Sequence, residues 1–222
     1  MTDLLDRPAR HSIVVLGRQG SGKGEQCTRL ARTLGVEHVS TGEVLRAAAR
    51  DGSPLGRAAD DHLERGEPVP DHLVAGIVAE RLAVAAAHGR GVVLDGYPRT
   101  VVQADRLASL LAPAAIDLAI NIDVPRSVAV TRIQNRRVCG SCGATGANDV
   151  RCPICGGSTA RRADDVPASI GRRMHDHDAQ AGPLLAWFSA RGVLETVDGL
   201  GTPEAVAARI ADVVGRRLLV TA

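Results

Sequence analysis

The sequence contains very few aromatic residues and almost no lysine. Its only aromatic side chains are Tyr97, Trp187 and Phe188, although 45% of the 222 residues are hydrophobic. A core must therefore be built mainly from Ala, Val, Leu and Ile. Lys23 is the single lysine beside 26 arginines. The place where this one lysine stands is therefore informative about function.

Long apolar runs are also missing. No segment approaches the roughly 18 apolar residues of a membrane span, and residues 1–17 hold no apolar run of signal-peptide length. We therefore expect a cytoplasmic, monomeric protein without a membrane partner. The net charge of +2 argues neither for nor against a nucleic-acid partner, and we expect none.

Short apolar segments alternate with segments of helical periodicity. Strands are expected at 12–16, 37–40, 91–96, 116–124 and 192–199. Helices are expected at 23–34, 41–52, 55–66, 71–88, 100–111, from Pro125 onward, 166–190 and 202–218. Residues 138–160 show no periodicity. The alternation predicts an α/β fold with a five-stranded parallel sheet covered by helices on both faces.

The segment "GRQGSGKGEQ", residues 17–26, joins the first expected strand to the first expected helix. Gly17, Gly22 and Lys23 satisfy the phosphate-binding pattern G-x-x-x-x-G-K-[ST], but Gly24 stands at the hydroxyl position. Glycines let backbone N–H groups approach a phosphate, and a lysine reaches the terminal phosphates as a compact charge. The context favours a phosphate-binding loop over a glycine-rich turn without a ligand.

Four of the five cysteines lie close together, as C-x₂-C followed nine residues later by a second C-x₂-C. They are Cys139, Cys142, Cys152 and Cys155. In a reducing compartment this clustering favours a metal site over disulfides, and four thiolates form a closed, structural Zn²⁺ site. An iron–sulfur cluster and an insert without metal remain alternatives. Cys27 is interpreted as a small buried residue.

Several stretches, taken in order, resemble the adenylate kinases. They are "GRQGSGKGEQ", "STGEVLRAAARDGSPLG", "LDGYPRTVVQADRL", "TRIQNRRVCGSC", "RRADDVPASIGRRM" and "VDGLGTPEAV". The resemblance covers nearly the whole chain. It implies a P-loop NTPase-type core spanning 1–222, a helical insert at 41–70 that binds the nucleoside monophosphate, and a short zinc-binding lid at 136–165. It further implies reversible, Mg²⁺-dependent phosphoryl transfer from ATP to AMP.

The resemblance also implies roles for individual residues. The implied catalytic set is Lys23, Asp95, Arg99, Arg136, Arg162 and Arg173, in which Asp95 matches the family residue that holds Mg²⁺ through water. The implied ATP-binding set is Gly20, Ser21, Gly22, Lys23, Gly24, Glu25, Arg132 and Arg136. The implied AMP-binding set is Thr41, Arg46, Leu63, Val69, Gly96, Arg99, Gln103, Arg162 and Arg173.

Two residues of the loop depart from the family pattern. Gln19 replaces a proline, and Glu25 replaces a threonine that donates to a phosphate. A carboxylate ~5 Å from a phosphate charge would oppose binding by roughly 3 kcal/mol at an effective dielectric constant of ~20. Either Glu25 turns away, or the loop has lost ATP.

Three alternatives to an active adenylate kinase therefore stay open at this point. One is a catalytically weak or silent paralogue that binds nucleotide. Another is a kinase for a different nucleoside monophosphate. The third is a zinc-ribbon protein that binds nucleic acid, against which the near-neutral charge and the lack of aromatic residues in the lid both argue.

Overall fold

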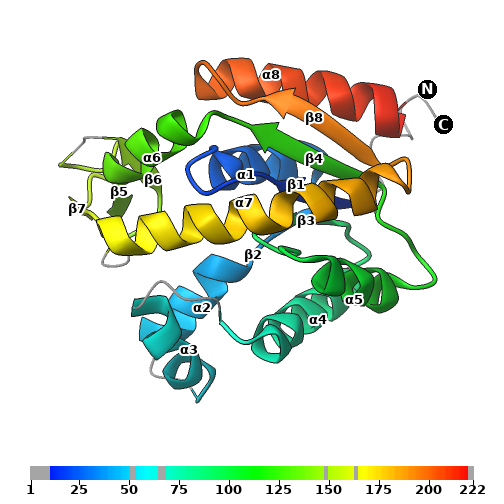
Figure 1. Cartoon of the computed structure of the whole chain (residues 1–222), viewed down its shortest axis with the longest axis horizontal. Helices are drawn as coiled ribbons and strands as arrows, with labels where there is room; N and C mark the ends of the chain where they lie inside the picture. Colours follow the sequence, from blue (N-terminus) through cyan, green and yellow to red (C-terminus); the bar gives the residue numbers. More distant parts are fainter. Residues whose placement is uncertain (1–10, 51–53, 65–68, 148–149, 163–164, 220–222) are drawn as a thin grey trace.

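A computed structural model of the chain describes residues 11–50, 54–64, 69–147, 150–162 and 165–219. Its centre is a five-stranded parallel sheet with the strand order β2-β3-β1-β4-β8 (Figure 1). The strands are β1 (Ser12–Leu16), β2 (Glu37–Ser40), β3 (Val92–Asp95), β4 (Leu118–Asp123) and β8 (Leu194–Asp198). The predicted five-stranded α/β architecture is confirmed.

Side chains of β1 alternate between the two faces of the sheet, and each face has its own helical cover. Val14 and Leu16 pack with α4 (Asp71–Ala87), α5 (Val101–Leu111) and α7 (Pro167–Ser189). Ile13 and Val15 pack with α1 (Lys23–Leu34) and α8 (Pro203–Val214), after which the π-helix η1 (Gly215–Leu219) follows. This alternation is the period of two that a strand imposes on its side chains. Both faces are apolar because both are covered.

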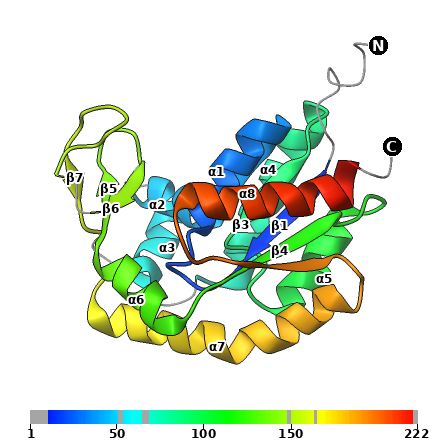
Figure 2. The ribbon, with the colours of Figure 1, turned by 90° about the horizontal axis from the view of Figure 1, so that it is seen from above.

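Two smaller units extend from this core. Helices α2 (Thr41–Arg50) and α3 (Pro54–Glu64) pack against each other below the sheet in Figure 1. After α6 (Arg126–Gln134), an antiparallel sheet of order β6-β5-β7 projects from the core in Figure 2, within the segment 136–165 that is expected to form the lid. Its strands are β5 (Arg136–Cys139), β6 (Thr145–Ala147) and β7 (Thr159–Ala160). This sheet could not be predicted from sequence, because strands of two to four residues are too short to display periodicity.

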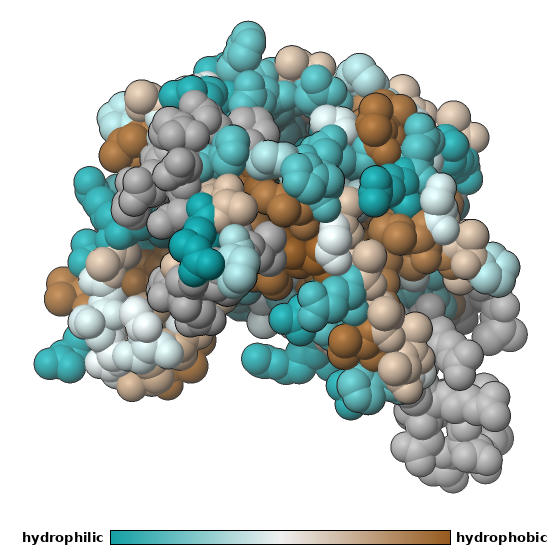
Figure 3. Space-filling model, turned by 90° about the horizontal axis from the view of Figure 1, so that it is seen from below, coloured by the Kyte–Doolittle hydropathy of each residue, from teal (hydrophilic) through white to brown (hydrophobic). Residues whose placement is uncertain are grey.

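One face of the molecule carries both polar and apolar side chains (Figure 3). Figure 3 shows one face on which hydrophilic side chains surround several separate hydrophobic patches. Among the described helices, none combines the length and the apolar character that crossing a membrane requires.

The carboxyl ends of β1, β2 and β3 lie along one edge of the sheet. Leu16 of β1 leads into the glycine-rich loop, Ser40 of β2 leads into α2, and β3 ends at Asp95. Parallel α/β sheets bind their ligands at this edge. The site is therefore to be sought around residues 17–24, 41 and 95.

Candidate active site

Two glycines give the loop its shape. Gly17 has a φ of +130°, and a Cβ atom there would lie 2.5 Å from the carbonyl oxygen of Ile122 on β4. Gly20 has a φ of +84°, and a Cβ atom there would collide with the carbonyl oxygen of Ala129 on α6. Both positions exclude any side chain, because the backbone conformation and the space both oppose one. The loop is thereby pressed against the sheet and α6.

Lys23 reaches back across this loop. Its ammonium donates to the carbonyl oxygens of Gly17 at 2.6 Å and Arg18 at 2.9 Å. Burial lowers the pKa of Lys23, and the charge of Asp95 opposes that shift. Ser21 lies in the same loop, and its buried Oγ has no hydrogen-bond partner among the described residues. A lysine curled into the loop and an orphaned hydroxyl are features that an anionic ligand would satisfy.

The first turn of α1 faces the end of β3. Gly22 precedes the helix with a φ of +96°, and no side chain caps this N-terminus. A Cβ atom on Gly24 would lie 3.5 Å from Oδ2 of Asp95. The carboxylate of Asp95 therefore lies beside an uncapped helix N-terminus, where free N–H groups and the helix dipole attract anions.

Glu25 turns away from the loop. Its Oε1 accepts a hydrogen bond from Nε of Arg29 at 2.6 Å, one helical turn further along α1. The same guanidinium donates to Glu204 on α8 at 2.9 Å. The side chain of Glu25 is 46% exposed. Of the two outcomes that the sequence left open, the structure therefore has the first, in which the carboxylate points to an arginine and to solvent.

Two arginines from other elements converge on the loop. Arg136 on β5 forms a two-pronged ion pair with Asp165, with contacts of 2.5 to 2.9 Å. Arg173 on α7 lies 3.7 Å from the same carboxylate, whose side chain is only 2% exposed. With its amide oriented to match these donors, the Gln19 oxygen accepts from Arg136 at 3.0 Å and from Arg173 at 3.1 Å. A loop residue and an aspartate thus hold both guanidiniums above the loop.

Arg132, the second arginine of the implied ATP-binding set, also contacts the loop. Arg132 on α6 donates to the carbonyl oxygens of Ser21 at 3.4 Å and Gly199 at 3.1 Å. Arg162 lies at the end of a described stretch beyond β7, and its carbonyl oxygen accepts from the N–H of Asp165 at 3.1 Å. Residues 163–164, which follow it in the segment expected to form the lid, lie outside the described residues.

Several residues of the implied AMP-binding set lie near the carboxyl ends of β2 and β3. Gln103 is 7% exposed; its side-chain oxygen accepts from the N–H of Arg99 at 2.7 Å, and its nitrogen donates to Asp71 at 2.6 Å. The guanidinium of Arg99 donates to the carbonyl oxygen of Gly96 at 2.8 Å. Thr41 is 2% exposed and contacts the carbonyl oxygen of Asp95 at 3.5 Å.

The remaining acceptor-side predictions fall on or beside the α2–α3 unit. Arg46 lies on α2, and its guanidinium would be 3.2 Å from a Cβ atom on Gly42. Val69 is buried in the core. Leu63 belongs to α3, but its side chain lies outside the described residues.

The four lid cysteines form one cluster. Their sulfur atoms all lie within 4.8 Å of one another, with 3.5 Å between Cys139 and Cys155 and 3.6 Å between Cys142 and Cys152. These separations exceed a disulfide bond of about 2 Å and approach the roughly 3.8 Å between thiolates on a tetrahedral zinc ion. All four are free thiols. The cluster therefore fits a metal ion, as the cysteine spacing predicts.

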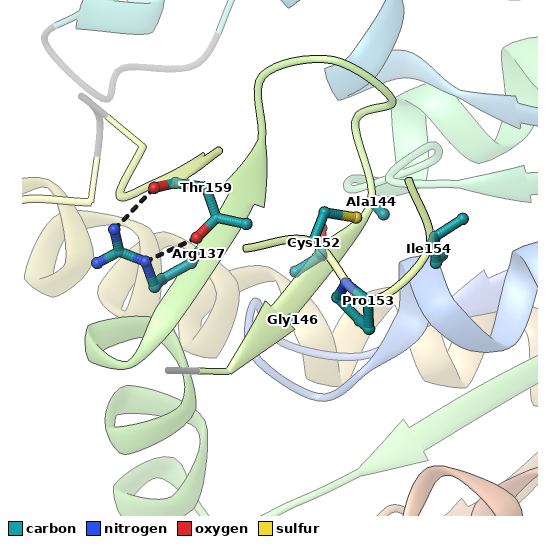
Figure 4. Close-up of a pocket in the computed structure, with 8 residues that line it drawn as sticks. Arg137, Ala144, Gly146, Cys152, Pro153, Ile154 and Thr159 are labelled. Carbon is teal, nitrogen blue, oxygen red and sulfur yellow. Dashed lines mark hydrogen bonds between the residues drawn. The ribbon is translucent and has the colours of Figure 1, made fainter. Parts of the chain in front are cut away.

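Hydrogen bonds tie together the strands next to this cluster, and a small pocket lies between them and Cys152. Arg137 on β5 donates to the side-chain oxygen of Thr159 at 2.9 Å and to its carbonyl oxygen at 2.7 Å, which ties β5 to β7 (Figure 4). Cys152, Pro153 and Ile154 lie on the other side of the same pocket. A hydrogen bond from the backbone of Cys142 lowers the pKa of Cys139 to about 6, whereas the neighbouring thiols of Cys155 and Cys152 raise the pKa of Cys142. Metal binding takes cysteines as thiolates, so it would release the remaining thiol protons.

Sequence reasoning missed the residues that hold the site in place. Asp165, Asp71 and Glu204 had no assigned role, yet each pairs with a residue of the site or of α1. Asp165 lies inside "RRADDVPASIGRRM", and its acidic pair between arginines was the available signal. The contact of Gln19 with two arginines had no signal, because it joins segments more than 100 residues apart.

The fold and this site define a class of protein. A strand, a glycine-rich loop and a helix carry one lysine, and arginines from β5 and α7 face the same loop. Such an arrangement characterises P-loop enzymes that act on nucleotide phosphates.

Comparisons with known proteins narrow this class. The adenylate kinase family model matches residues 15–193. The adenylate kinase of Geobacter sp. (strain M21) is 40% identical over 204 residues, which cover 88% of this chain and 95% of that protein. The adenylate kinase of Geobacillus sp. (strain WCH70) is 38% identical over 213 residues, which cover 92% and 98%. That of Methanosarcina acetivorans is 40% identical over 197 residues, which cover 85% and 91%.

The chain belongs to the adenylate kinase family and is a phosphotransferase of the nucleoside monophosphate kinase type. The comparisons do not favour a silent paralogue or a kinase for another nucleoside monophosphate.

Proposed function

We propose that this chain transfers a phosphoryl group reversibly between ATP and AMP, giving two ADP, with the residue roles described below. The observation that carries the proposal is the convergence of Arg136 and Arg173 on the loop that holds Lys23. A transferring phosphoryl spreads negative charge over three oxygens, and these cations can meet it from several sides.

On the donor side, the loop N–H groups from Gly20 to Gly24 and the ammonium of Lys23 would bind the ATP phosphates. Lys23 would leave the two carbonyl oxygens it now contacts and turn to the phosphates. Arg132, held beside Ser21 and Gly199, supports the ATP base.

Mg²⁺ with ATP is the expected cofactor, and Asp95 is the residue we assign to it. The carboxylate lies at the carboxyl end of β3 beside Gly24, and a hard cation that keeps several waters needs only such oxygen ligands. The ion would neutralise charge on the phosphates. Asp95 would orient its waters.

No general base is required for the transfer, because the attacking AMP oxygen is already anionic. The work of this chain is to position two highly charged groups in line and to neutralise them. Arg136 and Arg173 would exchange their contacts with Gln19 for contacts with the transferring phosphoryl. Arg162 would join them from the lid.

On the acceptor side, Arg46 and Arg99 would bind the AMP phosphate. Thr41 and Gln103 would recognise adenine by hydrogen bonds, and Gly96, Leu63 and Val69 would line the pocket. Asp71 and the N–H of Arg99 already fix the amide of Gln103 in one orientation. A fixed amide would reject bases that leave it unpaired.

Zinc in the lid and a cytoplasmic monomer complete the proposal. The close spacing of the four sulfur atoms favours zinc, which would supply stability that so small a sheet lacks. Five free thiols suit a reducing compartment.

A coupled assay tests the proposal. Purified protein with Mg²⁺ and ATP would receive AMP, UMP, CMP and GMP in turn, and ADP formation should be fastest with AMP. Lys23→Ala should lower turnover by at least about a thousandfold while circular dichroism stays unchanged, because the loop loses its only ammonium group. Full turnover in Lys23→Ala, or faster reaction with another acceptor, would overturn the assignment.

A further inference from the structure

A second group of potential metal ligands lies apart from the four lid cysteines. Cys27 on α1, His38 on β2 and Asp95 at the end of β3 each offer one ligand atom, and these atoms lie within 4.8 Å of one another. Strands β2 and β3 are hydrogen-bonded neighbours, and α1 packs on β3 (Figure 1). Rigid elements of the core therefore bring the three side chains together.

One of the three groups holds a polar atom that the described residues leave unsatisfied. Cys27 is 0% exposed, forms no disulfide and packs in the apolar cluster beside α1 and α8. The Nε2 atom of His38 is buried without a hydrogen-bond partner among the described residues, whereas its Nδ1 lies 3.4 Å from Oγ1 of Thr28. An unpaired buried nitrogen costs free energy, and a metal ion would satisfy it.

The chemistry of the three ligands selects the kind of ion. A thiolate, an imidazole and a carboxylate suit Zn²⁺, whereas Mg²⁺ takes oxygen ligands almost exclusively. In a tetrahedral zinc site such ligands lie roughly 3.3 to 3.5 Å apart. The ligand atoms now lie within 4.8 Å of one another, so they would have to approach by no more than about 1.5 Å. Three protein ligands leave a fourth position for water.

Burial raises the pKa of the Cys27 thiol well above its ordinary value, the negative charges of Asp95 and Glu43 raise it further, and Lys23 lowers it. The thiol therefore keeps its proton until a metal ion displaces it, while the two carboxylates favour a bound cation. Binding would also release the thiol proton to water, since a metal takes the thiolate form. Occupancy should therefore need a higher free zinc concentration than the four-cysteine lid, which has no ammonium group beside it.

We infer that Cys27, His38 and Asp95 form a second site, which binds a thiophilic divalent cation of the Zn²⁺ type. Occupancy ties the Asp95 carboxylate to that ion and withdraws it from Mg²⁺. This consequence for turnover rests on the proposed function; the existence of the site does not.

Metal stoichiometry tests the site without reference to activity. Full-length protein would be dialysed against buffered free Zn²⁺ at increasing concentration and analysed by atomic emission. Wild type should reach about two ions per chain, and Cys27→Ser and His38→Gln about one each, with serine keeping the volume of the buried thiol. Cys142→Ser is the matched control: it should lose the tighter lid ion and keep the weaker one. One ion in wild type, or two in Cys27→Ser, would overturn the inference.

Turnover at buffered free Zn²⁺ tests the consequence. Wild type should lose activity as the weaker site fills, and added Mg²⁺ should restore it. Cys27→Ser should need at least about tenfold more zinc for the same inhibition. Equal sensitivity of the two proteins would overturn the link to Asp95. Absence of turnover in wild type that holds only the lid ion would instead refute the proposed function, while the stoichiometry would still decide the site.

Discussion

The carboxylate of Glu25 accepts a hydrogen bond from Nε of Arg29 at 2.6 Å, within the first turns of the helix that follows the phosphate loop. The arginine also binds Glu204 at 2.9 Å, so it links α1 to α8. The sequence alone predicted that a carboxylate at this position could repel a bound phosphate. In the structure its charge is paired and directed along the outside of α1, and the loop keeps its positive character.

Replacing Glu25 should therefore change ATP binding little. A repulsion of roughly 3 kcal/mol would make Glu25→Thr bind ATP more than about a hundredfold more tightly. With the charge paired and exposed, we expect the KM for ATP to change by less than about threefold, since exposed ion pairs are screened by solvent. Steady-state kinetics at low and high salt would measure this. A hundredfold decrease in KM would show that the carboxylate faces the phosphates.

Gln19 offers a sharper test of the loop. Its amide oxygen lies 3.0 Å and 3.1 Å from the two arginines that we assign to the transferring phosphoryl. Gln19→Glu would turn neutral hydrogen bonds into charge-assisted ones, which are about twice as strong. We therefore expect the KM for ATP to rise at least about tenfold, because the substrate must displace a better-held pair. Gln19→Ala is the control and should not raise KM. An unchanged KM in Gln19→Glu would show that these arginines do not meet the phosphoryl.

The central sheet could be predicted because its signals are local. The β-branched run at Ser12–Leu16 and the glycines that follow it specify a buried strand and a phosphate loop within one short segment. The lid cysteines were likewise recognisable, since two C-x₂-C pairs carry their own spacing. Local patterns of this kind can be recognised without knowledge of the tertiary structure.

The supporting contacts of the site could not be predicted in the same way. Asp165 meets Arg136 across 29 positions, and Gln103 meets Asp71 across 32. Only the folded chain decides which charged side chain reaches which partner. The direction of the Glu25 side chain could not be predicted either. Arg29 is recognisable in the sequence as an i,i+4 partner, but the sequence does not say whether Glu25 turns to that arginine or to the phosphates.

Asp165 should matter for catalysis, although the sequence assigned it no role. It is buried and holds Arg136 by two prongs, so Asp165→Asn leaves a guanidinium with weaker partners. We expect kcat to fall at least about tenfold and the free energy of unfolding to fall by about 1–3 kcal/mol. Urea unfolding and steady-state kinetics would measure both.

A matched control for this variant is Glu195→Gln. Glu195 on β8 pairs with Arg217 at 3.5 Å, far along the chain from the phosphate loop, and both side chains are about one-third exposed. Such a pair contributes little, so kcat and the unfolding midpoint should stay close to those of wild type. Equal effects in the two variants would mean that Asp165 has no special role in positioning Arg136.

Removal of one lid cysteine should separate the lid from the core. Cys142→Ser breaks the four-sulfur cluster, and we expect the protein to lose about one tightly bound zinc ion per chain. The core sheet should stay folded, because its two apolar clusters contain no lid residue. Turnover should fall, because Arg136 lies on β5, and β5 would lose the metal cluster that holds its other end, Cys139, in place. Zinc emission, far-ultraviolet circular dichroism and kcat measured on one sample would check all three, with Cys27→Ser as the cysteine variant that keeps the lid ion. Unchanged tight zinc in Cys142→Ser would show that the four sulfurs do not form a closed metal site.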